Sequence, residues 1–191
     1  EPQSINYKPM IEEAQIYQAL TLGVKDYFQK TGFHDAVIGL SGGIDSALVA
    51  AIACNALGSD HVTGITMPSK YSSDHSIDDS EILAVNLGLN FERISIEDLN
   101  TGFLNSLDPF FGNTDAGLAE ENLQARIRGN ILMAVANKKN ALVLNTGNKT
   151  ETALGYCTMY GDMCGALGVI SDLNKHQVYS LSKWINIFYK E

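Results

Sequence analysis

The sequence predicts an α/β fold built on a doubly wound, open parallel sheet with helices on both faces. Short apolar runs of strand length alternate with longer segments whose apolar residues recur at helical spacing. Turn signals follow the runs that end at Leu40, Met67 and Asn145, and ligands of such sheets bind at the carboxyl ends of the strands. The chain has 191 residues, 45% of them hydrophobic, which is enough to bury a sizeable core in one domain.

The elements are expected in a regular order. A stripe that includes Ile11, Tyr17, Val24 and Phe28 indicates the first helix, and Ser72 or Ser73 suits the N-cap of the third. The stretch that holds Pro109, Gly112 and Gly117 is expected to be irregular. Helices are expected over 10–30, 45–57, 74–88, 118–138 and 176–189, and strands over 36–40, 61–67, 90–96 and 141–145.

Charge and composition exclude several classes of partner. The net charge of −9 repels phosphate backbones, so we expect no nucleic-acid partner, although a local nest of N–H groups can still bind a small phosphate ligand. No apolar run has the length to span a membrane, so no membrane partner is expected. Three cysteines without a CxxC pair indicate neither a disulfide framework nor a zinc site, which favours a reducing, cytoplasmic location.

The strongest motif joins the first strand to the helix that follows it, and it reads Gly39-Leu40-Ser41-Gly42-Gly43-Ile44-Asp45-Ser46. Its glycines allow a tight turn, its serines add donors, and the next helix directs free N–H groups at the loop, which together predict a phosphate site. Asp45 would repel a phosphate unless a cation lay between them, so the motif also predicts bound Mg²⁺.

A plain glycine-rich turn, with Asp45 as a helix-start residue, is the structural alternative for this loop. The motif lacks the Gly-Lys-Ser/Thr ending of a Walker A loop and does not match the dinucleotide fingerprint GxGxxG.

With Ser-Gly-Gly-x-Asp-Ser after its first strand, the chain resembles the ATP-pyrophosphatase family, which has an adenine nucleotide alpha hydrolase-like fold. The second half narrows the resemblance. Residues 120–133, 145–162 and 67–73 look like those of NAD synthetases, especially the synthetase domain of the glutamine-dependent type; they read EENLQARIRGNILM, NTGNKTETALGYCTMYGD and MPSKYSS.

The resemblance implies roles for particular residues. Asp45 and Lys175 would be catalytic, with Lys175 on the phosphate oxygens of ATP. Asn122, Arg126 and Glu151 would bind deamido-NAD, and Asp45, Glu151 and Asp162 would form the Mg²⁺ site. ATP would be bound by Gly39, Leu40, Ser41, Gly42, Gly43, Ile44, Asp45, Ser46, Thr146 and Lys175.

The residues themselves leave some of these roles open. Glu151 and Asp162 follow the fourth strand, at the edge of the expected crevice, but could also form a solvated face. Arg126 and Arg128 lie two positions apart on one helix and point in different directions, so at most one should face a ligand. For Arg128 an ordinary ion pair is as good an interpretation as a functional one. Met159 stands where ammonia-only relatives carry a lysine, and we assign it no role.

The implied function is that of a ligase forming a C–N bond. Deamido-NAD would be adenylated by ATP and then amidated by ammonia, with release of AMP and pyrophosphate. Ammonia would be free or derived from glutamine, and resemblance also implies a homodimer with the 118–138 helix as a candidate interface. The alternatives are another ATP-pyrophosphatase, such as a GMP synthetase-like or tRNA-thiolating enzyme, and a non-catalytic ATP-binding sensor.

We expect residues 1–191 to form a single synthetase domain. The chain starts at Glu1-Pro2 and stops inside a helix-like stretch, so we expect it to be truncated at the C-terminus. An N-terminal glutaminase domain could have been separated from it.

Overall fold

In the computed structural model, residues 11–70, 72–112 and 114–188 are described. Their sheet has five strands in the order β3-β2-β1-β4-β5, and every pair of neighbours is parallel. The doubly wound parallel sheet predicted from the sequence is therefore confirmed. The strands are β1 (Asp35–Leu40), β2 (Val62–Thr66), β3 (Asn90–Arg93), β4 (Ala141–Asn145) and β5 (Leu167–Gly168).

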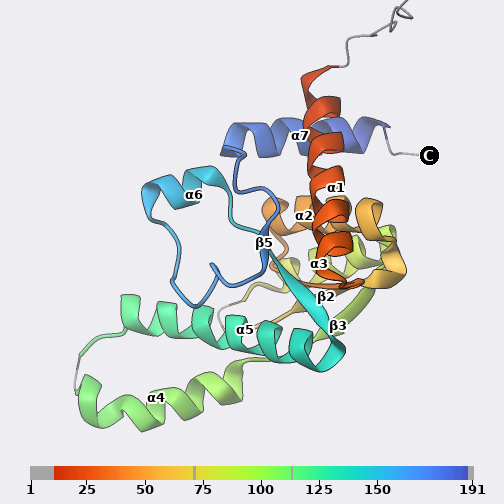
Figure 1. Cartoon of the computed structure of the whole chain (residues 1–191). Coiled ribbons are helices and arrows are strands. Elements are labelled where there is room, and N and C mark those ends of the chain that lie inside the picture. Colours follow the sequence, from red (N-terminus) through yellow and green to blue (C-terminus); the bar gives the residue numbers. More distant parts are fainter. Residues whose placement is uncertain (1–10, 71, 113, 189–191) are drawn as a thin grey trace, which may run out of the picture.

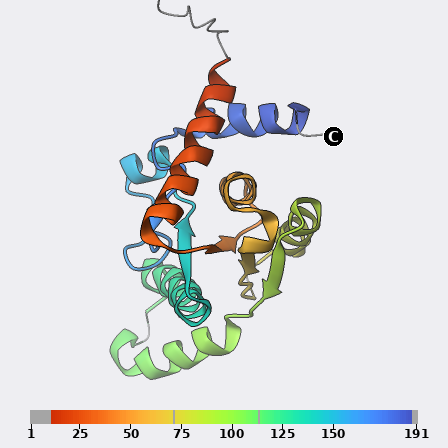
Figure 2. The same ribbon diagram turned by 45° about the vertical axis from the view of Figure 1, so that its right-hand side comes forward.

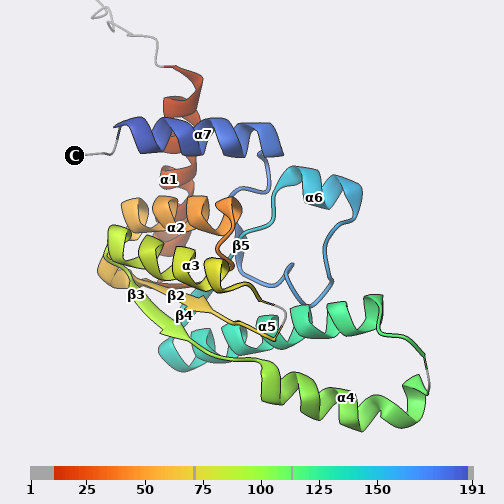
Figure 3. The same ribbon diagram turned by 180° about the vertical axis from the view of Figure 1, so that it is seen from behind.

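Helices cover both faces of this sheet (Figures 1 and 3). On one face α2 and α3 pack on the strands, and α1 and α7 pack on α2; on the other face α5 packs on β1 and β4, and α4 packs on α5. The helices are α1 (Glu12–Thr31), α2 (Ile44–Leu57), α3 (Asp74–Leu87), α4 (Glu97–Phe111), α5 (Leu118–Lys139), α6 (Lys149–Leu154) and α7 (Lys175–Phe188), with a 3₁₀ turn at Ser59–His61. Within these described ranges, no helix is both long and apolar enough to cross a membrane.

The central strand β1 divides the core between the two faces. Ala36, Ile38 and Leu40 belong to the cluster shared with α1, α2 and α7, whereas Val37 belongs to the cluster shared with α5. This alternation follows from the two-residue period of a strand. Because both faces are covered, β1 is apolar from Ala36 to Leu40, as a buried parallel strand should be.

The strand order reverses at β1, which is where a ligand crevice forms in such sheets. From β1 the chain adds β2 and then β3 on one side, and afterwards β4 and β5 on the other. Figure 2 shows β4 on the side of β1 away from β3. The loops that follow β1 and β4 therefore diverge on either side of a gap at the carboxyl edge of the sheet.

The structure departs from the sequence expectation in three elements. The stretch expected to be irregular contains α4, because the half-buried residues Leu104, Leu107 and Phe111 recur at helical spacing and the helix packs on α5. Pro109 lies in the last turn, where its missing N–H removes only one helical hydrogen bond. The short elements α6 and β5 were also not expected. Residues 10 and 189, which the expected helices included, lie outside the described residues.

Candidate functional site

The loop between β1 and α2 is closed by its two serines. The Ser41 backbone N–H donates to Ser46 Oγ at 3.3 Å, and the Ser46 hydroxyl donates to the Gly43 carbonyl at 3.0 Å. The Gly43 N–H donates to Ser41 Oγ at 3.2 Å. Among the described residues Gly43, the N-cap of α2, has no side-chain capping hydrogen bond, so the positive end of the helix faces the loop.

Gly42 is required for the shape of this loop. Its φ is +76°, in the left-handed region, and a Cβ atom there would lie 2.6 Å from the Ser76 carbonyl oxygen in the first turn of α3. The loop between β1 and α2 is therefore packed directly on α3, whose N-cap is Ser73, one of the two serines expected there.

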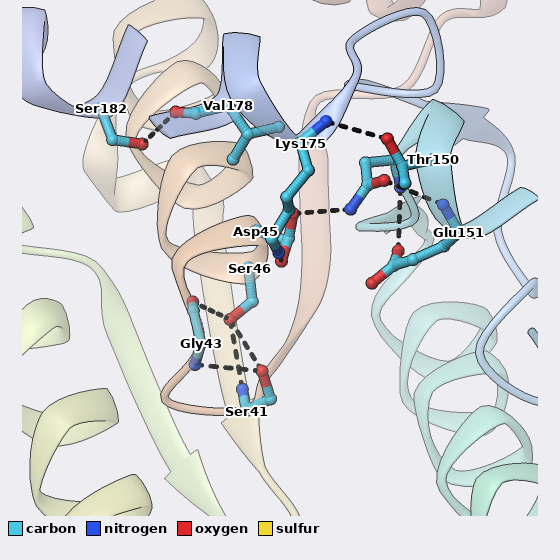
Figure 4. A network of polar contacts seen from close by, with 10 residues as sticks. Ser41, Gly43, Asp45, Ser46, Thr150, Glu151, Lys175, Val178 and Ser182 are labelled. Atoms are coloured by element: carbon cyan, nitrogen blue, oxygen red, sulfur yellow. Dashed lines mark hydrogen bonds and ion pairs between the residues drawn. The ribbon is translucent and has the colours of Figure 1, made fainter. Parts of the chain in front are cut away.

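Asp45, in the first turn of α2, is held by residues from two distant segments. Its Oδ1 accepts a hydrogen bond of 2.9 Å from Asn148 Nδ2, and its Oδ2 pairs with Lys175 Nζ. Figure 4 shows Lys175 beside the Asp45 carboxylate. The structure thus brings together the two residues expected to be catalytic, Asp45 and Lys175.

The start of α6 carries Glu151 into the same region. Asn148 caps this helix: its Oδ1 accepts from the Glu151 N–H at 3.0 Å, and the Glu151 carboxylate accepts from the Asn148 N–H at 3.1 Å. Thr150 accepts a hydrogen bond of 3.0 Å from the N–H of Lys175 (Figure 4). The first turn of α6 therefore fixes the start of α7, and with it the backbone that carries Lys175.

Asp162 lies in the loop between α6 and β5. Its Oδ1 accepts from the Thr158 N–H at 2.7 Å, and its carbonyl accepts from Asn145 Nδ2 at 2.6 Å. Asn145 ends β4, so Asp162 is attached to the carboxyl edge of the sheet.

Two cavities adjoin along this edge, and Ser41, Asn145, Thr146 and Asp162 line both of them. The first has a volume of about 500 Å³ and several apolar walls, among them Leu40, Met67, Leu132 and Val143. The second has a volume of about 550 Å³ and is more acidic. All three carboxylates expected to hold Mg²⁺ line the second cavity: Asp45, Glu151 and Asp162.

These three carboxylates do not converge into a finished metal site. Among the described residues, no group of three histidine, cysteine, aspartate or glutamate side chains is close enough to hold an ion. Asp45 is engaged by Lys175 and Asn148 instead. The oxygens nevertheless suit Mg²⁺, which is bound in proteins through one or two carboxylates together with waters and substrate phosphates.

The residues expected to bind ATP are distributed over both cavities. Gly39, Leu40, Ser41 and Thr146 line the first, and Ser41, Asp45, Ser46 and Thr146 line the second. Gly42, Gly43 and Ile44 belong to the same loop without lining either cavity, and Lys175 joins the site through Asp45.

Two residues expected to bind deamido-NAD lie elsewhere. Asn122 and Arg126 line neither of the two cavities, and both hold the loop after α6. Asn122 Oδ1 accepts from the Thr158 hydroxyl at 2.7 Å, and Arg126 Nε donates to the Met159 carbonyl at 3.2 Å. Their contact with the dinucleotide stays a prediction.

Arg128, which sequence reasoning left open, lines the first cavity. Its Nε donates to the Met67 carbonyl at 3.0 Å, and burial lowers the pKa of its guanidinium from the ordinary value. Asn145 and Asn148 were also missed. A capping signal was present for Asn148, because Glu151 follows it by three residues.

Comparisons with known proteins agree on one family. The NAD synthase family model matches residues 16–190. The chain is 57% identical over 178 residues to a glutamine-dependent NAD(+) synthetase of Synechocystis sp.; the match covers 93% of this chain and 32% of that relative. The chain thus spans about a third of the length of such curated relatives.

Solved structures give the same result. A glutamine-dependent NAD+ synthetase from Acinetobacter baumannii, in complex with ADP, superposes with a TM-score of 0.95 at 44% identity, over 97% of this chain and 36% of that chain. An NH3-dependent NAD synthetase from Campylobacter jejuni superposes with a TM-score of 0.85 at 31% identity, over 94% of this chain and 76% of that chain. The chain belongs to the NAD synthase family.

Proposed function

We propose that the chain is the synthetase domain of an NAD synthetase, a ligase that amidates deamido-NAD at the expense of ATP. The observation that carries the proposal is the second cavity. It brings the Ser41–Ser46 loop, the open N-terminus of α2 and three carboxylates to one edge of the sheet, beside a more apolar cavity. The ADP bound by the relative from Acinetobacter baumannii supports a nucleotide in this fold.

The two cavities suit the two ends of ATP. Apolar walls such as Met67 and Leu132 make the first cavity fit for the adenine base. The second, with Ser46 and the N-terminus of α2, is fit for the β- and γ-phosphates. The α-phosphate would then lie near Ser41 and Thr146, which line both cavities.

The donor atoms of the second cavity suit a Mg²⁺ ion, because carboxylates of three residues line one cavity: Asp45, Glu151 and Asp162. Mg²⁺ bound with the triphosphate would neutralise charge that grows on the departing pyrophosphate. Lys175 would contribute to the same end, because its ammonium group already reaches the cavity wall at Asp45.

The chemistry needs no covalent nucleophile from the protein. The nicotinate carboxylate of deamido-NAD attacks the α-phosphorus of ATP, the bond to the bridging α,β-oxygen breaks, and pyrophosphate leaves. Ammonia then attacks the acyl carbon of the adenylate, loses a proton to solvent, and AMP leaves with the carboxylate oxygen. The loop N–H groups and the N-terminus of α2 stabilise negative charge on the phosphates throughout.

Three further features belong to the same proposal. Glutamine, acting through a glutaminase domain linked to this chain, would supply ammonia, as the names of the longer relatives suggest for those proteins. Two copies would pair through α5, which carries the exposed side chains of Leu118 and Met133. The protein would act in the cytoplasm, where its three free cysteines stay reduced.

The test is a product analysis. The chain is incubated with ATP, Mg²⁺, deamido-NAD and ammonium, and NAD, AMP and pyrophosphate are separated by chromatography. Equal amounts of the three products are expected. ADP and phosphate in their place would contradict cleavage between the α- and β-phosphates.

Thermal protection separates the acceptors when turnover is too slow to measure. Protection by deamido-NAD but not by GMP is expected. Protection by GMP would support a GMP synthetase-like enzyme, and protection by ATP alone without any product would support a sensor. Repeating the product assay with glutamine, on this chain and on a chain joined to a glutaminase domain, tests the nitrogen source.

A further inference from the structure

The two oxygens of Asp45 are held by partners of very different mobility. Oδ1 accepts from the amide of Asn148, whose side chain is fully buried, with a relative exposure of 0%. Oδ2 pairs with Lys175, whose side chain keeps 37% of its surface exposed. A cation that approaches Asp45 meets an oxygen that already has a partner on either side of the carboxylate.

Asn148 cannot easily be displaced, because each of its polar groups is used in the same small network. Its Oδ1 and backbone N–H form the reciprocal capping box with Glu151, at 3.0 and 3.1 Å. Its Nδ2 is thereby directed at Asp45, at 2.9 Å. Moving the amide away from Asp45 would uncap α6 and leave a buried polar group without a partner, which is costly.

Lys175 is the partner that can leave. Its ammonium group stands at the end of a flexible chain, 5.7 Å from the centroid of the Tyr179 ring, and its backbone N–H is fixed by Thr150. A substrate phosphate would offer the ammonium group another anion. In Figure 4 the side chain of Lys175 extends from the start of α7 toward Asp45. Replacing the partner of Oδ2 with a cation therefore costs less free energy than replacing the partner of Oδ1.

We propose that Asn148 is a positioning residue, which locks Oδ1 of Asp45 and so presents Oδ2 as the exchangeable oxygen for the cation that accompanies ATP. Without the cation Lys175 pairs with Oδ2, and its ammonium group would move to the phosphates when the cation binds. Asn148 also contacts Glu151, whose backbone N–H donates to Asn148 Oδ1 and whose carboxylate accepts from the Asn148 backbone N–H, so one residue contacts two of the three carboxylates of the second cavity. The inference rests on the proposed function, because it concerns the binding of MgATP.

Two substitutions separate this role from helix capping. Asn148→Ser and Asn148→Asp both keep a side-chain oxygen that can cap α6. Serine is too short to donate to Asp45, and aspartate replaces the donor with a second carboxylate. In Asn148→Ser, Lys175 is free to contact both oxygens of Asp45, which makes its displacement harder.

Isothermal titration with α,β-methylene-ATP gives the readout without turnover. Titrations are made with Mg²⁺ and with EDTA, and the ratio of the two Kd values measures how much the cation tightens binding. For Asn148→Ser we expect Kd in EDTA to change little and Kd in Mg²⁺ to rise about tenfold or more, the factor that follows from losing a hydrogen bond to a charged group. Asn148→Asp should also change the ratio of the two Kd values, because its added carboxylate competes with Asp45 for Lys175 and for Mg²⁺.

The matched control is Asn174→Ser. Asn174 forms the same reciprocal pair with Gln177 at the start of α7, at 3.0 Å in both directions, and has no hydrogen bond to Asp45. It should keep the wild-type ratio.

Wild-type Mg²⁺ dependence in both Asn148 variants would overturn the positioning role. A lower melting temperature with equal loss of affinity in Mg²⁺ and EDTA would also overturn it, in favour of capping alone. If the unchanged chain fails to bind the ATP analogue, the proposed function fails and this inference with it.

Discussion

The Thr158 hydroxyl donates to Asn122 Oδ1 on α5 at 2.7 Å, and this bond is one of several that hold the loop after α6 against one face of that helix. Arg126 binds the carbonyl of Met159 one turn further along, and Gly129 lies another turn on, against the carbonyl of Gly161. Positions 122, 126 and 129 share a helix face by their spacing. The loop that carries Asp162 is therefore docked on α5 by its backbone.

The first prediction concerns the close contact between the loop after α6 and helix α5. A Cβ atom on Gly161 would lie 2.9 Å from Ala125 Cβ, so Gly161→Ala should push the loop from α5. We expect a loss of about 1–3 kcal/mol in the free energy of unfolding, as for other overpacked sites. Urea unfolding followed by circular dichroism measures it.

Gly102→Ala is the matched control for that substitution. Gly102 lies inside α4 with nothing within 4 Å of a Cβ atom, so alanine should stabilise the chain by roughly 0.5–1 kcal/mol. Equal effects of the two alanines would show that the contact with α5 carries no strain.

The second prediction concerns Asp45. Asp45→Asn keeps the size of the side chain but removes the negative charge that pairs with Lys175 and would hold Mg²⁺. We expect NAD formation to fall by at least about 100-fold, because without the ion the charge on the leaving pyrophosphate is no longer balanced. The rate of AMP release measures it. Asp26→Asn is the control, since Asp26 forms only an exposed pair with Lys30 on α1 and should leave the rate unchanged. A rate for Asp45→Asn close to wild type would contradict the role given to this carboxylate.

The sheet and most helices were predictable from the sequence because their signal is a long apolar pattern. The run from Ala36 to Leu40 is buried on both faces, and so it appears in the sequence as an uninterrupted apolar strand. The helix 118–138 was placed within one residue of α5, since its repeat continues over many turns.

Short or polar elements were not predictable in the same way. Pro109 and Gly112 suggested an irregular stretch. Pro109, however, removes only one hydrogen bond near the end of α4, and the packing of this helix on α5 stabilises it by more than that loss. The two-residue strand β5 depends on pairing with β4 and has no pattern of its own.

Within the site, residue types were easier to predict than contacts. The serines and glycines of the loop from Ser41 to Ser46 are neighbours in the sequence, so the position of this motif at the start of α2 could be predicted directly. The pairing of Asp45 with Asn148 and Lys175 joins residues more than 100 positions apart, and only the fold brings them together. Burial of Arg128 likewise depends on how α5 is rotated on the sheet.

The third prediction separates the two arginines of α5. Arg128 lines the first cavity and Arg126 does not, so Arg128→Met should raise the KM for ATP, whereas Arg126→Met should leave it within about twofold. Arg128→Met should also lower the free energy of unfolding by about 1–3 kcal/mol, because the Met67 carbonyl loses its buried donor. Steady-state kinetics at saturating deamido-NAD measure the KM for ATP, and urea unfolding measures the free energy of unfolding. A higher KM for ATP in the Arg126 variant alone would reverse this assignment.

The fourth prediction concerns stability at alkaline pH. Burial raises the pKa of the Cys54 and Cys164 thiols above the ordinary value of 9.0, and the charge of Asp162 adds to the effect at Cys164. The unfolded chain therefore loses these two protons at a lower pH than the folded chain does. Their contribution to stability is complete below about pH 9 and is lost as the pH rises through the folded-state pKa values.

Urea unfolding of the wild type and of a Cys54→Ala/Cys164→Ala variant, at pH values from 7 to 11, isolates this contribution from that of other groups. The free energy of unfolding of the wild type should fall more steeply above pH 9 than that of the variant, and the two curves should run parallel below it. Parallel curves over the whole range would mean that neither thiol is desolvated in the folded protein. Since Cys164 lines the first cavity, a nucleotide that fills the cavity should also slow its alkylation by iodoacetamide.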